Sequence, residues 1–124
     1  MIYLLVAVGG AAGSVMRLAV GRAVIGLLGP GTIWGTLFVN VTGSFALGFF
    51  LAWTLQRGEV SADLRAMIAI GLLGGYTTFS TLSYDTVRLL ESGEIARAGL
   101  NIAASLIVGL AAAYAGVLAG RALT

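Results

Sequence analysis

The chain has 124 residues, of which 59% are hydrophobic and only 10% are charged, and its mean hydropathy is +1.02. A soluble domain of this size needs a charged surface that this composition cannot supply, so the sequence predicts an integral membrane protein. The absence of cysteine and histidine excludes disulfides and removes the commonest metal ligand and general base, and a net charge of +2 is too small to suggest nucleic-acid binding.

Four segments are long and apolar enough to cross a bilayer, which takes about 20 residues per helix. The first carries its arginines late, at Arg17 and Arg22, whereas a signal peptide carries positive charge before its apolar run, so this segment is predicted to be a retained helix. The sequence therefore predicts an all-α membrane protein with one four-helix transmembrane domain over residues 1–124, with spans at residues 2–28, 32–55, 61–90 and 94–123.

Small and polar residues recur every four positions on three of these spans. Such stripes let helix backbones approach closely in lipid, and packing alone is the simplest reading of most of their glycines. Four helices make a thin bundle that cannot easily enclose a protected pathway, so an oligomer is expected. The stripes are Gly9, Gly13, Arg17 and Gly21 on the first span, Asn40, Ser44 and Gly48 on the second, and Asn101, Ser105, Gly109 and Ala113 on the fourth.

The arginines are balanced between the two sides of the membrane. With four spans, Arg57, Arg65 and Arg121 share one side, and Arg22, Arg88 and Arg97, with Arg17 if it is counted, share the other. Orientation follows the bias of basic residues in the loops, and here that bias is close to nil. Two readings are open: a weakly determined single orientation, or insertion in both orientations, which would give an antiparallel dimer with the inverted symmetry of many transporters.

The third span contains an unusual polar stretch, GGYTTFSTLSYD, over residues 74–85. Seven of the ten residues after the two glycines carry a hydroxyl. We expect the glycines to break the helix near its centre and to free backbone carbonyls, which is tolerated at membrane depth only inside protein or beside water. Freed carbonyls can bind a cation and hydroxyls can donate to an anion. If the chain is helical after the break, Ser80 and Ser83 share one face, as do Phe79 and Leu82.

Three other polar positions lie inside the spans. Asn40 is either interhelical glue or a pathway residue, and Asn101 extends a polar line toward Ser105. Arg17 lies deep in the first span, where a charge costs roughly 2.5–3.5 kcal/mol on insertion scales, so it either pairs with Asp85 or provides a positive potential in a vestibule. The spans thus carry hydrogen-bond donors and one arginine but no acidic residue in mid-helix. This set favours an anion as the permeating species over a proton or a cationic drug.

These residues closely resemble the small dual-topology fluoride channels of the Fluc or CrcB type. The resemblance covers the whole chain and is carried by GGAAGSVMR in the first span, GTLFVN in the second and, most specifically, GLLGGYTTFST in the third. It implies a fluoride-selective channel that exports cytoplasmic fluoride, built as an antiparallel homodimer with two narrow pores; the sequence leaves open whether a paralogue takes the place of the second copy. It also implies a multi-pass protein of the prokaryotic plasma (inner) membrane.

The resemblance also implies roles for individual residues. It assigns the backbone carbonyls of Gly74 and Thr77 to a structural sodium ion, so that two copies would supply four oxygen ligands. The clear departure is Leu82, which stands where the family pattern has its second phenylalanine, and Asp85 stands where relatives have glutamate. The pore residues that it implies are Asn40, Phe79, Ser80, Thr81, Asn101 and Ser105; the helical spacing adds Leu82 and Ser83 to the expected pore, and Arg17 is expected as the vestibule charge.

Three other functions fit the sequence less well than a channel does. A small proton-coupled exporter of organic cations has the same size and can share the dual topology, but it needs an intramembrane carboxylate, and the first span has none. A non-transporting assembly subunit would explain the small-residue stripes and leave the hydroxyl run without a purpose. An enzyme is not expected, because the sequence offers no histidine, cysteine or in-membrane carboxylate pair.

Overall fold

The computed structural model describes residues 1–31 and 33–124, and over these residues it is helical with short connections. Four helical segments are long and apolar enough to cross a membrane, which confirms the all-α, four-span expectation. Thr32, where the second span was expected to begin, lies outside the described residues. The four candidate spans are Ile2–Leu28, Trp34–Arg57, Ala62–Glu91 and Ile95–Ala122.

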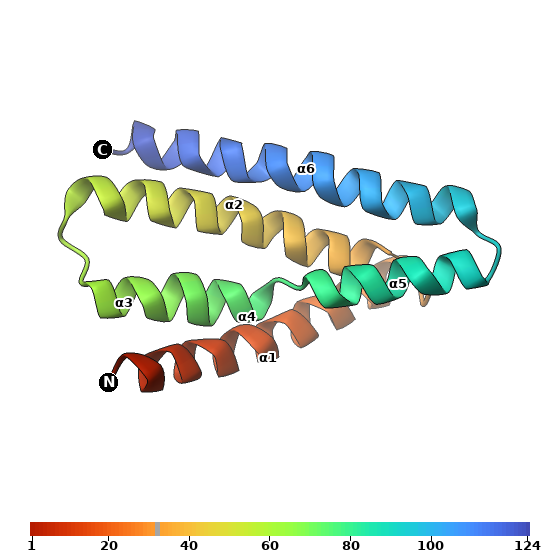
Figure 1. Cartoon of the computed structure of the whole chain (residues 1–124), viewed down its shortest axis with the longest axis horizontal. Coiled ribbons are helices and arrows are strands. Elements are labelled where there is room, and N and C mark those ends of the chain that lie inside the picture. Colours follow the sequence, from red (N-terminus) through yellow and green to blue (C-terminus); the bar gives the residue numbers. More distant parts are fainter. Residues whose placement is uncertain (32) are drawn as a thin grey trace.

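The spans form an elongated bundle in which both termini lie at the same end as the loop between the second and third spans (Figure 1). Helix α6 (Ile95–Ala122) runs beside α2 (Trp34–Arg57), and α1 (Ile2–Leu28) crosses beneath the third span. The third span is made of four pieces in line, α3 (Ala62–Ala66), η1 (Met67–Leu73), α4 (Gly74–Tyr76) and α5 (Phe79–Glu91).

Glycines hold α2 against α6 at backbone distance. A Cβ atom added at Gly48 would overlap the carbonyl oxygen of Ala113, and one added at Gly116 would overlap that of Phe45. Close backbone approach is the usual way in which helices associate in lipid, where hydrophobic burial does not drive them together. Gly48 is therefore a packing residue, as the simpler reading of its stripe expected, and Gly116 is a packing residue that the stripes did not include, whereas an added Cβ at Gly109 meets no atom of the described chain within 4 Å.

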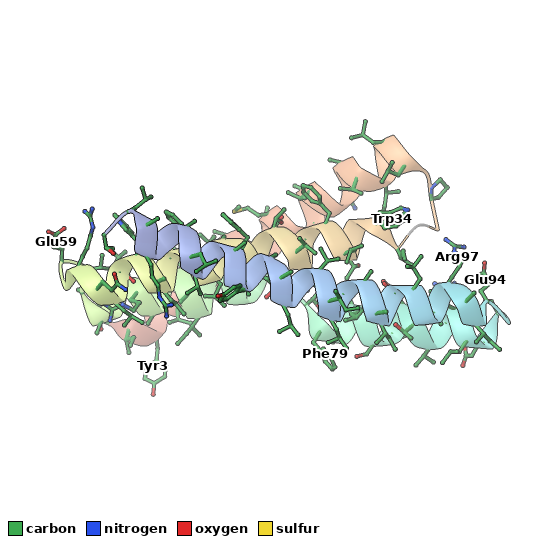
Figure 2. All side chains as sticks on the ribbon, turned by 90° about the horizontal axis from the view of Figure 1, so that it is seen from above. Tyr3, Trp34, Glu59, Phe79, Glu94 and Arg97 are labelled. Atoms are coloured by element: carbon green, nitrogen blue, oxygen red, sulfur yellow. The ribbon has the colours of Figure 1, made fainter. Side chains whose placement is uncertain are left out.

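A second glycine contact joins the first half of α1 to η1 and α4. A Cβ atom at Gly75 would lie 2.8 Å from the carbonyl oxygen of Gly10, and one at Gly71 would lie 2.7 Å from that of Val6. Gly21 belongs to the four-residue stripe predicted on α1 but makes no such contact, because an added Cβ there meets no atom of the described chain within 4 Å. The second half of α1 lies apart from α6 (Figure 2) and meets α2 at Gly35, where an added Cβ would lie 3.5 Å from the Gly21 carbonyl oxygen.

The third span breaks near its centre, as expected, but not at its glycines. Gly74 has a helical φ of −64° and ψ of −38°, and the glycines continue the helix. The extended residues are Thr77, with ψ 156°, and Thr78, with φ −151° and ψ 116°. The expectation that the two glycines form the break was therefore wrong: Gly75 lets the helix contact α1, and the break follows three residues after Gly74.

Candidate functional site

The break is held by a side chain from the middle of α2. The Oδ1 atom of Asn40 accepts a hydrogen bond from the backbone N–H of Thr78 at 2.7 Å, and its Nδ2 atom donates to the Thr78 carbonyl at 3.0 Å. Backbone groups that leave a helix at membrane depth need such partners, because no bulk water is available to them. Asn40 thus satisfies both polar groups of one extended residue, and this pairing fixes α5 to α2.

The Thr78 side chain organises the start of α5. Its Oγ1 accepts the backbone N–H of Thr81 at 3.2 Å, which is the side-chain cap that threonine commonly supplies at a helix N-terminus. The same hydroxyl donates to Oγ1 of Thr81 at 3.1 Å and lies 3.2 Å from Oγ of Ser80. The predicted hydroxyls of Ser80 and Thr81 are therefore gathered around Thr78, which is itself only 8% exposed.

Two clefts meet at Thr78. The first, called here the Asn40 cleft, has a volume of about 260 Å³ and brings together four of the eight predicted pore residues from three spans, while Ser80, Thr81, Ser83 and Asn101 do not line it. Its polar lining consists of amide and hydroxyl groups, and its apolar lining includes one aromatic ring. The residues that line it are Asn40, Gly43, Ser44, Leu47, Thr77, Thr78, Phe79, Leu82, Ser105 and Leu106.

The second, called here the Arg17 cleft, has a volume of about 390 Å³ and carries two guanidinium groups. The only ion pair among the described residues joins Arg97 to Glu94 at 2.9 Å, so Arg17 does not pair with Asp85. The Asp85 carboxylate instead accepts from the Thr36 hydroxyl at 3.4 Å. The residues that line this cleft are Ser14, Arg17, Leu18, Gly21, Arg22, Ile25, Gly35, Thr36, Val39, Thr78 and Thr81.

The two predicted residues of α6 have different surroundings. Ser105 lines the Asn40 cleft, and its Oγ atom is buried without a hydrogen-bond partner among the described residues. Asn101 is 1% exposed, donates to Oγ1 of Thr86 at 3.0 Å and lines neither cleft. Thr86 in turn donates to the Leu82 carbonyl at 2.8 Å. A buried hydroxyl without a partner is costly, so Ser105 is placed to donate to a cleft occupant, whereas Asn101 links α6 to α5.

Phe79 and Leu82 both line the Asn40 cleft, as their shared face predicted, but they differ in burial. The Phe79 side chain is 78% exposed and points away from the chain (Figure 2), while Leu82 is 8% exposed and packs inside it. Ser83 turns back along its own helix and donates to the Phe79 carbonyl at 3.0 Å. Ser83 therefore stabilises α5 and is not brought to either cleft.

The predicted cation ligands lie at opposite ends of α4: Gly74 is its first residue, and Thr77 follows its last. Gly74 is exposed, and Thr77 is half-buried and lines the Asn40 cleft. Among the described residues, no three Asp, Glu, His or Cys side chains gather at a distance suited to a metal. A cation at this depth would therefore depend on backbone and hydroxyl oxygens, which are the ligands that hard monovalent ions accept.

Sequence reasoning missed two residues that shape the break. Thr78 appeared only as one hydroxyl among seven, although a threonine directly before FSTLSYD is a helix N-cap signal. Tyr76 is 8% exposed, and its hydroxyl lies 2.9 Å from that of Thr42 on α2. No local pattern links Tyr76 to Thr42, because the contact depends on how the two spans pack.

Comparison with known proteins gives one consistent result over nearly the whole chain. The family model described as CrcB-like protein, Camphor Resistance (CrcB), matches residues 4–117. A relative from Thermus thermophilus, named fluoride-specific ion channel FluC, is 50% identical over 98% of this chain and 96% of its own length. A protein of the same name from Rhizobium etli is 48% identical over 97% of this chain and 96% of its own length.

Proposed function

Because this chain belongs to the CrcB-like family, we propose that it is a fluoride-selective ion channel, which lets cytoplasmic fluoride leave the cell down its electrochemical gradient. It is a multi-pass membrane protein, and the plasma membrane of a prokaryote is where such export lowers fluoride toxicity. The observation that carries the proposal is the meeting of two donor-lined clefts at Thr78, one of which also holds Arg17.

The lining of the clefts suits fluoride chemically. Fluoride is small and tightly hydrated, so a pathway must replace its water with hydrogen-bond donors. The Asn40 cleft offers the unpaired hydroxyl of Ser105, and the exposed ring of Phe79 has an electropositive edge. Arg17 adds a positive potential beside Thr78 that attracts anions. A proton-coupled exporter needs a carboxylate, and the described residues that line the two clefts include none.

The working unit is an antiparallel pair of chains. Three features of the single chain support this part of the proposal: the exposed Phe79, the uncovered side of Gly21 where an added Cβ meets no described atom within 4 Å, and the cleft at Arg17, which lies within the first span. Exposed charge facing lipid is costly, so these surfaces require a protein cover. The balanced arginines allow the second copy to insert in the opposite orientation, and a paralogue with a matching surface could take its place.

A structural sodium ion at the centre of this pair completes the proposal. Gly74 and Thr77 would hold it through their carbonyl oxygens, and the ion would fix the two third spans against each other. The donor set fits, because Gly74 is exposed and its own chain places no side chain over it. The ion supplies a central positive charge, while the anion path runs through the clefts.

Fluoride release from liposomes tests the function directly. Purified protein reconstituted into fluoride-loaded vesicles should release fluoride once a potassium ionophore balances the charge, and chloride-loaded vesicles should release their anion far more slowly. Empty vesicles and vesicles with a heat-aggregated sample serve as controls. Equal rates for the two anions, or fluoride movement that requires a proton gradient, would contradict the channel.

A further inference from the structure

Four backbone hydrogen bonds that a continuous helix would make, from the N–H groups of residues 78–81 to the carbonyls of residues 74–77, are missing at the break, and two of them would involve Gly74 and Thr77. In an α-helix each N–H bonds to the carbonyl four residues earlier, so Thr78 N–H would take the Gly74 carbonyl and Thr81 N–H would take the Thr77 carbonyl. Neither bond forms. Thr78 N–H donates to Oδ1 of Asn40 at 2.7 Å, and Thr81 N–H donates to Oγ1 of Thr78 at 3.2 Å.

We propose that Asn40 and Thr78 are the positioning residues of the cation site. Each uses a side-chain oxygen to divert one N–H group, and the two carbonyls released in this way are those of Gly74 and Thr77. The inference rests on the proposed function for the presence of a sodium ion. It assigns to Asn40 a role in the cation site in addition to its place in the cleft, and it gives Thr78 a role that the sequence had not suggested.

The surroundings of the two carbonyls agree with this assignment. At Thr77 both the backbone N–H and the side-chain hydroxyl donate to the Leu73 carbonyl at 3.1 Å, so the carbonyl is the polar group that this residue still offers. At Gly74 an added Cβ would meet only the Ala69 carbonyl oxygen, at an ordinary 3.7 Å. Its own chain thus leaves the surface at Gly74 clear for an ion or a second copy.

The extended segment is also tied to α2 on both sides, so the released carbonyls keep a fixed direction. Tyr76 is bonded through its hydroxyl to Thr42 at 2.9 Å, and Thr78 is bonded through its backbone to Asn40. Carbonyls held in place do not need to reorganise when an ion arrives. Without the side-chain oxygen of Asn40 or of Thr78, the corresponding N–H is free to bond to its helical carbonyl, and one ligand is withdrawn.

The test measures sodium binding rather than ion flux. Purified protein in detergent is heated at increasing sodium concentration, with N-methylglucamine keeping the ionic strength constant, because a ligand that binds the native state raises its thermal midpoint. Asn40→Ala and Thr78→Val should raise the sodium concentration at half-maximal stabilisation by about tenfold or more. Thr78→Ser keeps the hydroxyl and should restore the wild-type value, and Thr86→Val, an isosteric change of a buried threonine outside both clefts, should leave it unchanged.

An unchanged sodium midpoint in both Asn40→Ala and Thr78→Val would overturn the assignment, and so would a wild-type protein that sodium does not stabilise more than N-methylglucamine. The two variants remove different diverting groups, so either one suffices if the other does not fold, and Asn40→Ser provides a milder change at the first site. Sodium stabilisation that the variants lose, in a protein that passes no fluoride, would support this assignment and contradict only the proposed channel.

Discussion

Replacing Gly13 by alanine is expected to remove most of the folded protein, because its methyl group has nowhere to go. A Cβ atom at Gly13 would overlap the Leu72 carbonyl oxygen and lie 2.9 Å from the backbone nitrogen of Tyr76. Both obstacles are backbone atoms, so relief requires α1 to move away from η1 and α4. Overpacking of this kind costs typically 1–3 kcal/mol, and more where the backbone must shift.

The measurement is the yield of monodisperse protein on size exclusion, together with its thermal midpoint in detergent. Gly26→Ala on the same helix is the matched control, because no atom of the described chain lies within 4 Å of its added Cβ. We expect Gly26→Ala to match the wild type and Gly13→Ala to lose most of the monodisperse peak. Equal midpoints for Gly13→Ala and the wild type would show that α1 does not pack on η1 as described.

Phe79→Leu is expected to lower fluoride flux by more than tenfold, whereas Leu82→Phe is expected to change it by less. The Phe79 ring is 78% exposed in the single chain, so its loss removes little packing within the chain. What it removes is the electropositive ring edge in the Asn40 cleft. Leu82 is 8% exposed, and its side chain already fills by volume the position where the family pattern has its second phenylalanine. The Asn40 cleft beside it, of about 260 Å³, has room for a ring.

Both variants are compared by fluoride efflux from liposomes at matched protein amounts, after size exclusion has confirmed that each has the wild-type assembly state. If Leu82→Phe raises the flux more than tenfold, about 1.4 kcal/mol off the limiting barrier, the natural leucine limits the pathway. A paralogue that supplies the missing ring would then become the preferred partner. A Phe79→Leu variant with wild-type flux would remove the ring from the proposed pathway altogether.

Hydropathy predicted the four spans of this chain well, because it depends on residues taken one segment at a time. The position of the break was not predictable in that way. Glycines are the usual reason to expect irregular backbone, yet Gly74 is helical and Gly75 serves a contact with α1. The break depends on Thr78 and on Asn40, which lies 38 positions earlier in the chain. A pairing over that separation follows from packing and leaves no local pattern.

The polar residues were likewise predictable only in part from the sequence. Asn40, Phe79 and Ser105 meet in one cleft, as their positions on three spans and the family resemblance led us to expect. Asn101 looked equivalent to Ser105 along its helix, but its side-chain amide donates a hydrogen bond to the Thr86 hydroxyl on α5, and it lines neither cleft. Spacing shows which residues share a helical face and does not show which neighbouring span has already satisfied them.

We propose that two oppositely oriented copies are needed to close the clefts, and this requires both orientations to be present. Two pairs of substitutions at exposed positions can fix the orientation in which the chain inserts into the membrane. One pair is Glu59→Arg with Ala122→Arg, at the end that holds both termini, and the other is Leu90→Arg with Glu91→Arg, at the opposite end. Each pair adds two arginines to one side, and the side with more arginine is retained in the cytoplasm. Each variant alone should insert in one orientation and lack its partner.

The decisive measurement is fluoride efflux from liposomes that contain either variant alone or both variants after co-expression and co-purification. We predict that each variant alone passes fluoride at less than about a tenth of the wild-type rate, a change of about 1.4 kcal/mol in the apparent barrier, and that the co-expressed pair recovers the wild-type rate. Wild-type efflux from each variant alone, with labelling that confirms a single orientation for each, would contradict the antiparallel channel.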